Sequence, residues 1–324
     1  LKEEYEFLKL SPAQSLQQVG RQFGKALKDS FKKAKGFPKF KKKGNRDSFT
    51  IVEKFHINKN NVNLPKIGKV KWIKHRNLQG KPKFITVSRD GNQWFCSVTC
   101  EITINEQPKS ISNMVGIDLG LKDFAVLSDN TKIERIRFTK NDEKKLARAQ
   151  RKLSRKQKGS NNRKKQIKKV QAIHRNIANK RKDFLHKASS SIIAKYSGVA
   201  LESLKVKNMM KNRKLSKSFA DVSLFEFVRQ LEYKCKWNSK EFVQINTWYP
   251  SSKMCSCCGA KKDSLKLSER EYICTACGCV IERDYNASKN ILEEGLRELA
   301  ERNRRAASQR IPQGMRELTP LEIA

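Results

Sequence analysis

The segment CSCCGAKKDSLKLSEREYICTACGCVIERDYNAS, residues 255–288, decides the organisation of this chain. It contains two CxxC pairs separated by fifteen residues, and a glycine follows each pair. This spacing is typical of a structural zinc ribbon, in which four thiolates hold the ion tetrahedrally and leave no open position for catalysis. Using Cys257 or Cys279 instead would break the symmetry of the pairs. The zinc ligands that we predict are Cys255, Cys258, Cys274 and Cys277.

Three acidic residues stand where predicted strands end or the last helix begins. Asp118 lies in VGIDLG, Glu202 lies in VALES, and Asp284 opens the final helical run. Taken alone, these residues fit a turn, a surface acid and a helix N-cap, respectively. If the two strands are neighbours and the helix crosses them, the three carboxylates converge. Carboxylates suit Mg²⁺, and two such ions stabilise both the attacking water and the leaving oxygen of a phosphodiester.

The charge of the chain points to a polyanionic partner. It has 71 Lys and Arg against 32 Asp and Glu, a formal net charge of +39. Nucleic acid is the first candidate. An anionic membrane surface is the second, but the chain has no apolar run near the roughly 20 residues that a spanning helix needs. We predict no membrane association and a location in the cytoplasm or nucleoid; the resemblance given below implies that the cell is prokaryotic.

The most basic segment is residues 140–187, with 19 Lys and Arg against three acidic residues. The turn Gly159–Asn162 divides it, which predicts a helical hairpin. A solvated charged face is the alternative, but like charges at i,i+4 destabilise a helix. A second basic run spans residues 31–43. Trp72, Trp94 and Trp248 could stack on bases, but we interpret them as core residues.

The strand pattern predicts two kinds of structure. Residues 48–104 contain strand-like segments, which predict a small barrel or sandwich. Asp90-Gly91 predicts a hairpin turn between two of the strands. From Val115 the predicted order is three short strands, helices, a strand, a helix, a fifth strand, the zinc insert and a last helix. This order is that of an RNase H-like fold. The predicted elements of this second part are strands at 115–120, 123–128, 132–138, 199–203 and 241–246, and helices at 223–237 and 285–302.

Four motifs in this order resemble the TnpB (OrfB) family of transposon-encoded proteins, which are similar to type V CRISPR effectors. They are GIDLG, VALESLKVKNM, YPSSKMCSCCG and CTACGCVIERDYNASKNIL, and the resemblance covers about Leu1 to Leu299. It implies an RNA-guided, Mg²⁺-dependent DNA endonuclease with a single RuvC site. It also implies a guide RNA from the transposon end and a double-stranded DNA target beside a short motif. The catalytic residues so implied are Asp118, Glu202 and Asp284.

The resemblance also implies a domain order: a wedge-type β-barrel with a helical recognition segment, then an RNase H-like RuvC nuclease domain with a zinc-ribbon insert. Further recognition helices upstream of Leu1 are expected to be missing. Glu282 stands where the family often has Asp. The expected divisions are 1–44 (recognition segment), 45–110 (wedge barrel), 111–250 (nuclease domain), 251–280 (zinc ribbon), 281–305 (end of the nuclease domain) and 306–324 (flexible tail).

Two other functions fit the same motifs. One is an RNA-guided repressor that occupies DNA without cutting, but all three acids are present, which favours cutting. The other is a transposase-type enzyme that joins strands, for which the chain shows no separate joining domain. The sequence identifies no protein partner.

Overall fold

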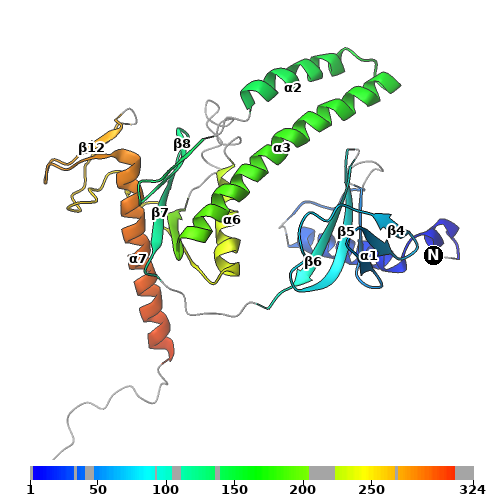
Figure 1. Cartoon of the computed structure of the whole chain (residues 1–324), viewed down its shortest axis with the longest axis horizontal. Helices are drawn as coiled ribbons and strands as arrows, with labels where there is room; N and C mark the ends of the chain where they lie inside the picture. The colour runs from blue at the N-terminus through cyan, green and yellow to red at the C-terminus, as the bar shows by residue number, and fades with distance from the viewer. Residues whose placement is uncertain are drawn as a thin grey trace, which may run out of the picture. The chain divides into compact units, whose positions relative to one another are not determined.

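The computed structural model describes residues 3–32, 35–40, 47–91, 93–103, 111–135, 139–203, 223–266 and 269–310. The chain divides into two compact units, Leu1–Ile104 and Asn105–Ala324 (Figure 1). No helix of the described residues is long and apolar enough to cross a membrane.

The first unit combines one α-helix with two antiparallel sheets. The sheets have the strand orders β1-β5-β6 and β2-β3-β4 and share the buried residues Ile51, Val62, Leu64 and Ile85. Asp90 pairs with Gln93, and Gly91 has a φ of +58°, so the predicted hairpin is confirmed. The elements are η1 (Glu6–Leu10), α1 (Ala13–Phe31), β1 (Ser48–Ile51), β2 (His56–Ile57), β3 (Asn61–Leu64), β4 (Gly68–Lys71), β5 (Lys81–Asp90) and β6 (Gln93–Glu101).

The second unit is built on a five-stranded sheet of order β11-β10-β7-β8-β9. Strands β7, β8 and β9 form an antiparallel meander, and β10 runs parallel to both β7 and β11. The first four residues of β7 and of β10 are all buried, as expected where helices cover both faces of a sheet. The strands are β7 (Met114–Leu119), β8 (Asp123–Leu127), β9 (Lys132–Glu134), β10 (Gly198–Glu202) and β11 (Glu241–Ile245).

Helices cover the two faces of this sheet with different side chains. Val115, Val199 and Leu201 pack toward α3 and α6, whereas Met114 and Ala200 belong to clusters with residues of α7. Figure 1 accordingly shows α3 and α7 on opposite sides of β7. Because strand side chains alternate between faces, even-numbered positions of β7 and β10 lie on the α7 face. The helices are α2 (Thr139–Ser154), α3 (Asn161–Lys195), α6 (Leu224–Trp237) and α7 (Arg283–Arg310).

Some element boundaries differ from those predicted. Helix α7 begins two residues earlier and ends eight residues later than the predicted helix 285–302. Strand β9 has only three residues, and the rest of predicted strand 132–138 beyond residue 135 lies outside the described residues. Residues 311–324 of the predicted tail and residues 33–34 and 41–43 of the second basic run also lie outside them.

Helix α7 approaches β7 through a glycine. A Cβ added at Gly116 would lie 2.1 Å from the carbonyl oxygen of Ser288 and 2.6 Å from the amide nitrogen of Leu292. These atoms are helix backbone, so they cannot move aside independently. A second close approach, between Gly295 and Ala200, brings the same helix against β10. Glycine at these positions therefore sets the distance between α7 and the sheet.

Gly116→Ala should destabilise the second unit by about 1–3 kcal/mol, because the new methyl group pushes the helix from the sheet. The urea dependence of the circular dichroism signal measures this. Gly20→Ala in α1 is the control, since an added Cβ there meets open space. It should be stabilising by roughly 0.5–1 kcal/mol through helix propensity. Equal stability of the Gly116→Ala and wild-type proteins would contradict the close packing.

Candidate active site

The sheet brings two of the predicted acids side by side. Ile117 and Leu201 are Cα partners in the parallel pair β7–β10, so Asp118 and Glu202 follow at adjacent positions. Both are even-numbered positions, so both carboxylates lie on the face that α7 covers. Asp284 is the second residue of α7, and that helix packs along β7 and β10. The three acids thus lie near one another at the carboxyl end of the central strands.

The electrostatics of Asp118 show that this carboxyl group lies close enough to Glu202 and Asp284 to be affected by their charges. Burial, followed by the negative charges of Glu202 and Asp284, raises the pKa of Asp118 to about 7, although the nearby Arg283 opposes the shift. Burial also raises the pKa of Glu202, against a hydrogen bond from Ser251. Such shifts arise where carboxylates are buried, and, for Asp118, where other negative charges lie nearby. A bound cation would offset those negative charges, and hard oxygen ligands fit Mg²⁺.

The carboxylates are neighbours without forming a closed ligand cluster. Within the described ranges, the groups of three or more ligand atoms that all lie within 4.8 Å of one another consist of cysteines. At least one pair of the three carboxylates is therefore separated by more than 4.8 Å.

Arg283 and Ser251, which the sequence analysis did not identify, hold two of the acids. Arg283 donates from Nε and Nη2 to Asp284 Oδ1, at 3.1 and 3.0 Å, and from Nη1 to the Glu269 carbonyl at 3.1 Å. Ser251 is buried and its hydroxyl donates to Glu202 Oε1. Two of the three carboxylates are therefore oriented by neighbouring side chains.

Two buried asparagines tie α7 to the start of the ribbon. Asn286 donates to the Met254 carbonyl at 2.6 Å and accepts from the Ser256 amide at 2.9 Å. Asn290 donates to the carbonyls of Ser251 (2.7 Å) and Met254 (2.8 Å). The spacing of four residues places both amides on one helix face. This i,i+4 pair in NASKN was the sequence signal that could have revealed the connection.

The predicted zinc ligands converge as a four-thiol set, and the two paired distances fit zinc. Cys255 Sγ lies 3.7 Å from Cys277 Sγ, and Cys258 Sγ lies 3.6 Å from Cys274 Sγ. A tetrahedral ion with Zn–S bonds of about 2.3 Å requires sulfur separations of about 3.8 Å. Gly259 and Gly278 close the two knuckles with φ of +76° and +71°. The ribbon's hairpin consists of β12 (Glu271–Ile273) and β13 (Val280–Glu282).

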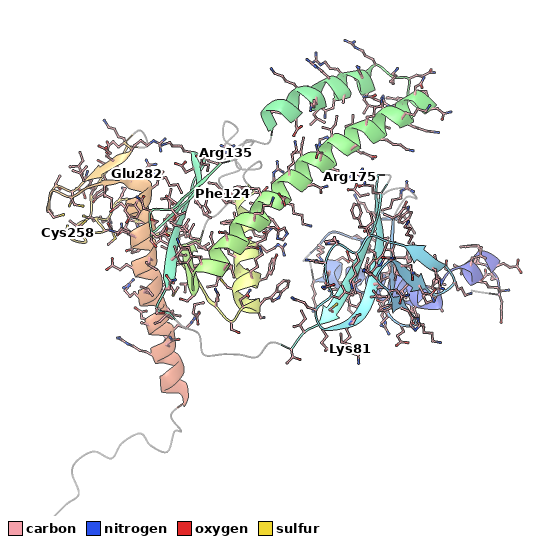
Figure 2. The ribbon with its side chains drawn as sticks, in the orientation of Figure 1. Lys81, Phe124, Arg135, Arg175, Cys258 and Glu282 are labelled. Atoms are coloured by element: carbon pink, nitrogen blue, oxygen red, sulfur yellow. The ribbon has the colours of Figure 1, made fainter. Side chains whose placement is uncertain are left out.

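A second cysteine group shares Cys255 with this set. It comprises Cys255, Cys257 and Cys279, and the Sγ atoms of the last two are 2.7 Å apart. Three thiols are fewer than a structural zinc site uses. The four-cysteine set therefore fits the metal better. Figure 2 shows Cys258 in the ribbon, and Glu282 where β13 leads into α7.

The Asp118 carboxyl group should make a contribution to the stability of the metal-free protein that is lost as the pH rises from about 4 to about 7. Asp118 has a pKa of about 7 in the folded protein against an ordinary value of 3.8, so the folded state binds more protons in this range. Stability then falls with increasing pH. The contribution of Asp118 to the free energy of unfolding is fully present below the ordinary pKa of 3.8. It is lost as the pH rises through the pKa of about 7 in the folded protein. The raised pKa of Glu202 acts in the same direction.

Urea unfolding in EDTA across this pH range measures the effect. The Asp118→Asn protein is the matched control, and its stability relative to wild type should increase with pH. Added Mg²⁺ should restore the wild-type stability above pH 7, because a ligand that binds only the folded state stabilises it. A difference between the two proteins that is constant with pH would contradict the raised pKa.

The basic segment forms two antiparallel helices, α2 and α3. Ser160 caps α3 by accepting from the Arg163 amide at 3.1 Å, and Gln166 donates to the Ala149 carbonyl at 2.9 Å. Lys180 pairs with Asp142 at 2.8 Å. Figure 2 shows side chains projecting from both helices along their length. The hairpin therefore presents many cations on a frame held by a few internal contacts.

The interpretation of the tryptophans as core residues is wrong for two of the three. Trp72 packs against the core of the first unit, and its ring nitrogen donates to the Asn58 carbonyl at 3.1 Å. Trp94 is 58% exposed and Trp248 is 81% exposed.

Comparison with known proteins identifies the family. The family profile OrfB_IS605, described as "Probable transposase", matches residues 97–213. The chain is 38% identical over 300 residues to a Streptomyces pristinaespiralis protein named "Putative RNA-guided DNA endonuclease", covering 91% of this chain and 74% of that protein. The chain belongs to the OrfB (TnpB) family. A second OrfB relative, "Putative RNA-guided DNA endonuclease InsQ" of Escherichia coli K12, is 35% identical over 309 residues, covering 90% of this chain and 77% of InsQ.

Two further matches concern the fold of this OrfB family member. The profile "Cas12f1-like, TNB domain" matches residues 225–291. A solved structure of a Cas12f1–sgRNA–target DNA complex superposes with a TM-score of 0.52 at 17% identity, over 82% of this chain and 68% of that one. The fold is therefore shared with Cas12f1. The residue ranges that the two profiles match include Asp118, Glu202, Asp284 and the predicted zinc ligands.

Proposed function

We propose that this OrfB-family protein is an RNA-guided DNA endonuclease that hydrolyses phosphodiester bonds with divalent metal. The observation that carries the proposal is the convergence of Asp118, Glu202 and Asp284 at one end of the sheet, with the pKa of Asp118 raised to about 7 by burial and by the other two charges. The relatives named RNA-guided DNA endonucleases support the choice of substrate and guide.

The topology supports an RNase H-like RuvC domain. An antiparallel meander, β7-β8-β9, is extended by the parallel strands β10 and β11, in the order that the sequence predicted. We assign residues 111–250 and 281–305 to this domain, and residues 251–280 to a zinc ribbon inserted before α7. The two sheets around one core in the first unit support a wedge-type barrel over 45–110.

Each residue of the site has a distinct role in this proposal. Divalent ions held by the three carboxylates, with Mg²⁺ favoured by the oxygen ligands, would supply water activation and neutralise the developing charge. Ser251 fixes the rotamer of Glu202, and Arg283 fixes that of Asp284. Asn286 and Asn290 hold the ribbon's first residues against α7, so the zinc site supports the active site without reacting.

Guide and target are held through their backbones in this proposal. A heteroduplex is recognised by shape and phosphate contacts while base pairing reads the sequence, which suits the net charge of +39 and the hairpin α2–α3. The affinity should fall steeply with salt because cations are released from the phosphates.

Plasmid cleavage tests the proposal. The protein is co-expressed with RNA from the transposon end and incubated with a plasmid library randomised beside the target. Wild type should cut plasmids that carry one short motif, and Asp118→Ala should not. Equal cutting by the two proteins would refute the site. Guided binding without cutting by wild type would identify a repressor instead. Absence of co-purifying RNA would refute guidance.

A further inference from the structure

Trp248 is the most exposed tryptophan of the described chain and lies beside the candidate active site. It is 81% exposed. It stands three residues beyond β11, whose last residue, Ile245, is the Cα partner of Glu202. Three residues later, the Ser251 hydroxyl donates to the Glu202 carboxylate. The indole therefore belongs to the same end of the sheet as the acids.

The turn that carries Trp248 is held on several sides. Its amide donates to Asn246 Oδ1 at 2.9 Å, and the Thr247 hydroxyl donates to the Ser203 carbonyl at 2.9 Å. Tyr249 packs against the buried cluster that contains Ile245. The residues on either side of Trp248 thus contact the body of the unit, while most of the Trp248 side chain remains exposed. Its exposure is a property of a fixed turn.

An exposed indole beside a nuclease site suits a nucleobase. Every base offers a flat face, and stacking on an aromatic side chain contributes about 1–3 kcal/mol per base. Within a duplex the base faces are covered by neighbouring pairs, so only an unpaired strand presents them. The net charge of +39 favours a polyanionic ligand over an apolar protein partner.

We propose that Trp248 stacks on an unpaired base of the DNA strand that enters the site of Asp118, Glu202 and Asp284. This inference rests on the proposed function and adds a contact to the single strand itself. Trp248 is a positioning residue here, because it holds the strand and does not touch the reacting phosphate.

Trp237 provides a matched control in the same unit. It is 64% exposed and ends α6, and three residues separate it from the start of β11. The start of β11 lies at the opposite end of the strands from Glu202, which pairs with the last residue of β11. Its ring lies 4.6 Å from that of Tyr233. Substituting Trp237 removes an exposed indole without reaching the carboxylates.

The test measures binding of an oligothymidylate to the full chain in the absence of divalent metal. Quenching of tryptophan fluorescence reports the binding. Wild type and Trp237→Ala should show the same affinity and a clear quench. Trp248→Ala should bind about tenfold more weakly, the lower part of the stacking range, and should lose most of the quench. Trp248→Phe should recover most of the affinity. The salt dependence should be unchanged, because no phosphate contact is removed.

Unchanged affinity and quench in Trp248→Ala would overturn the inference, as would an equal loss in Trp237→Ala or no recovery in Trp248→Phe. The binding measurement does not require cleavage. A wild type that fails to cut guided DNA would therefore refute the proposed function without deciding the outcome of the binding test. If wild type does cut, Trp248→Ala should raise KM for the DNA about tenfold with kcat little changed.

Discussion

Asp118→Asn should abolish DNA cleavage and, at the same time, make the metal-free protein more stable. The substitution keeps the shape of the side chain and removes one of three charges that repel one another. Cleavage should fall on the order of a thousandfold or more, the scale seen when one member of a cooperating catalytic set is removed. Stability above pH 7 should rise by roughly 1–3 kcal/mol, because the wild-type carboxylate is ionised there against a pKa raised to about 7.

Asp129→Asn is the matched control and should behave in the opposite way. Asp129 accepts hydrogen bonds from Lys195 at 2.6 Å, from the Tyr196 hydroxyl and from the Thr131 amide at 2.9 Å. These hydrogen bonds hold its pKa well below the ordinary value. The amide should destabilise the protein by about 1–2 kcal/mol and leave guided cleavage unchanged.

Plasmid cleavage with Mg²⁺ and urea unfolding in EDTA measure the two effects for both proteins. An Asp118→Asn protein that is inactive and also less stable than wild type would show that Asp118 supports the fold and is not held under repulsion.

Cys274→Ser should remove the zinc and with it the activity. With three thiolates left, the ribbon loses the metal that provides most of its folding free energy, on the order of 10 kcal/mol in small zinc domains. The partners of Asn286 and Asn290 at Ser251 and Met254 then move. Through Ser251 this also frees Glu202. Cleavage should fall about a hundredfold or more.

Cys279→Ser is the control for this prediction, because Cys279 lies outside the four-cysteine set. It should keep one zinc per chain and full cleavage. Metal analysis of the purified proteins and plasmid cleavage provide the two readouts. Full cleavage by zinc-free Cys274→Ser would refute the structural link, and loss of zinc from Cys279→Ser would mean that the ligand set is wrong.

The sequence could predict the strands of the second unit because they are short apolar runs closed by polar residues. It could predict the knuckles because CxxC followed by glycine is a local pattern. Residues 114–119 and 198–202 become neighbours only in the folded sheet, so the contact of Asp118 with Glu202 required a fold to be assumed. The resemblance to a family supplied that fold.

Contacts between distant segments were beyond the sequence. Ser251 and Glu202 are 49 residues apart, and Asn286 and Met254 are 32 apart. No local periodicity marks such pairs. Trp248 was misjudged for a related reason. Its apolar character suggested a buried residue, but the fixed turn uses Thr247 and Tyr249 for its inward contacts and leaves the indole outside.

Helix α3 is anchored to the sheet through its C-terminal third. Its 35 residues extend about 52 Å. The side chains that pack against the sheet face away from α7 are those of Leu185, Ile192 and Ile193. A displacement of about 3 Å at the N-terminal end of α3 would change the direction of the helix axis by only about 3°. We therefore expect a polyanion bound at the tip of the hairpin to displace the α3 side of the sheet little and to leave the carboxylates on the α7 side in place.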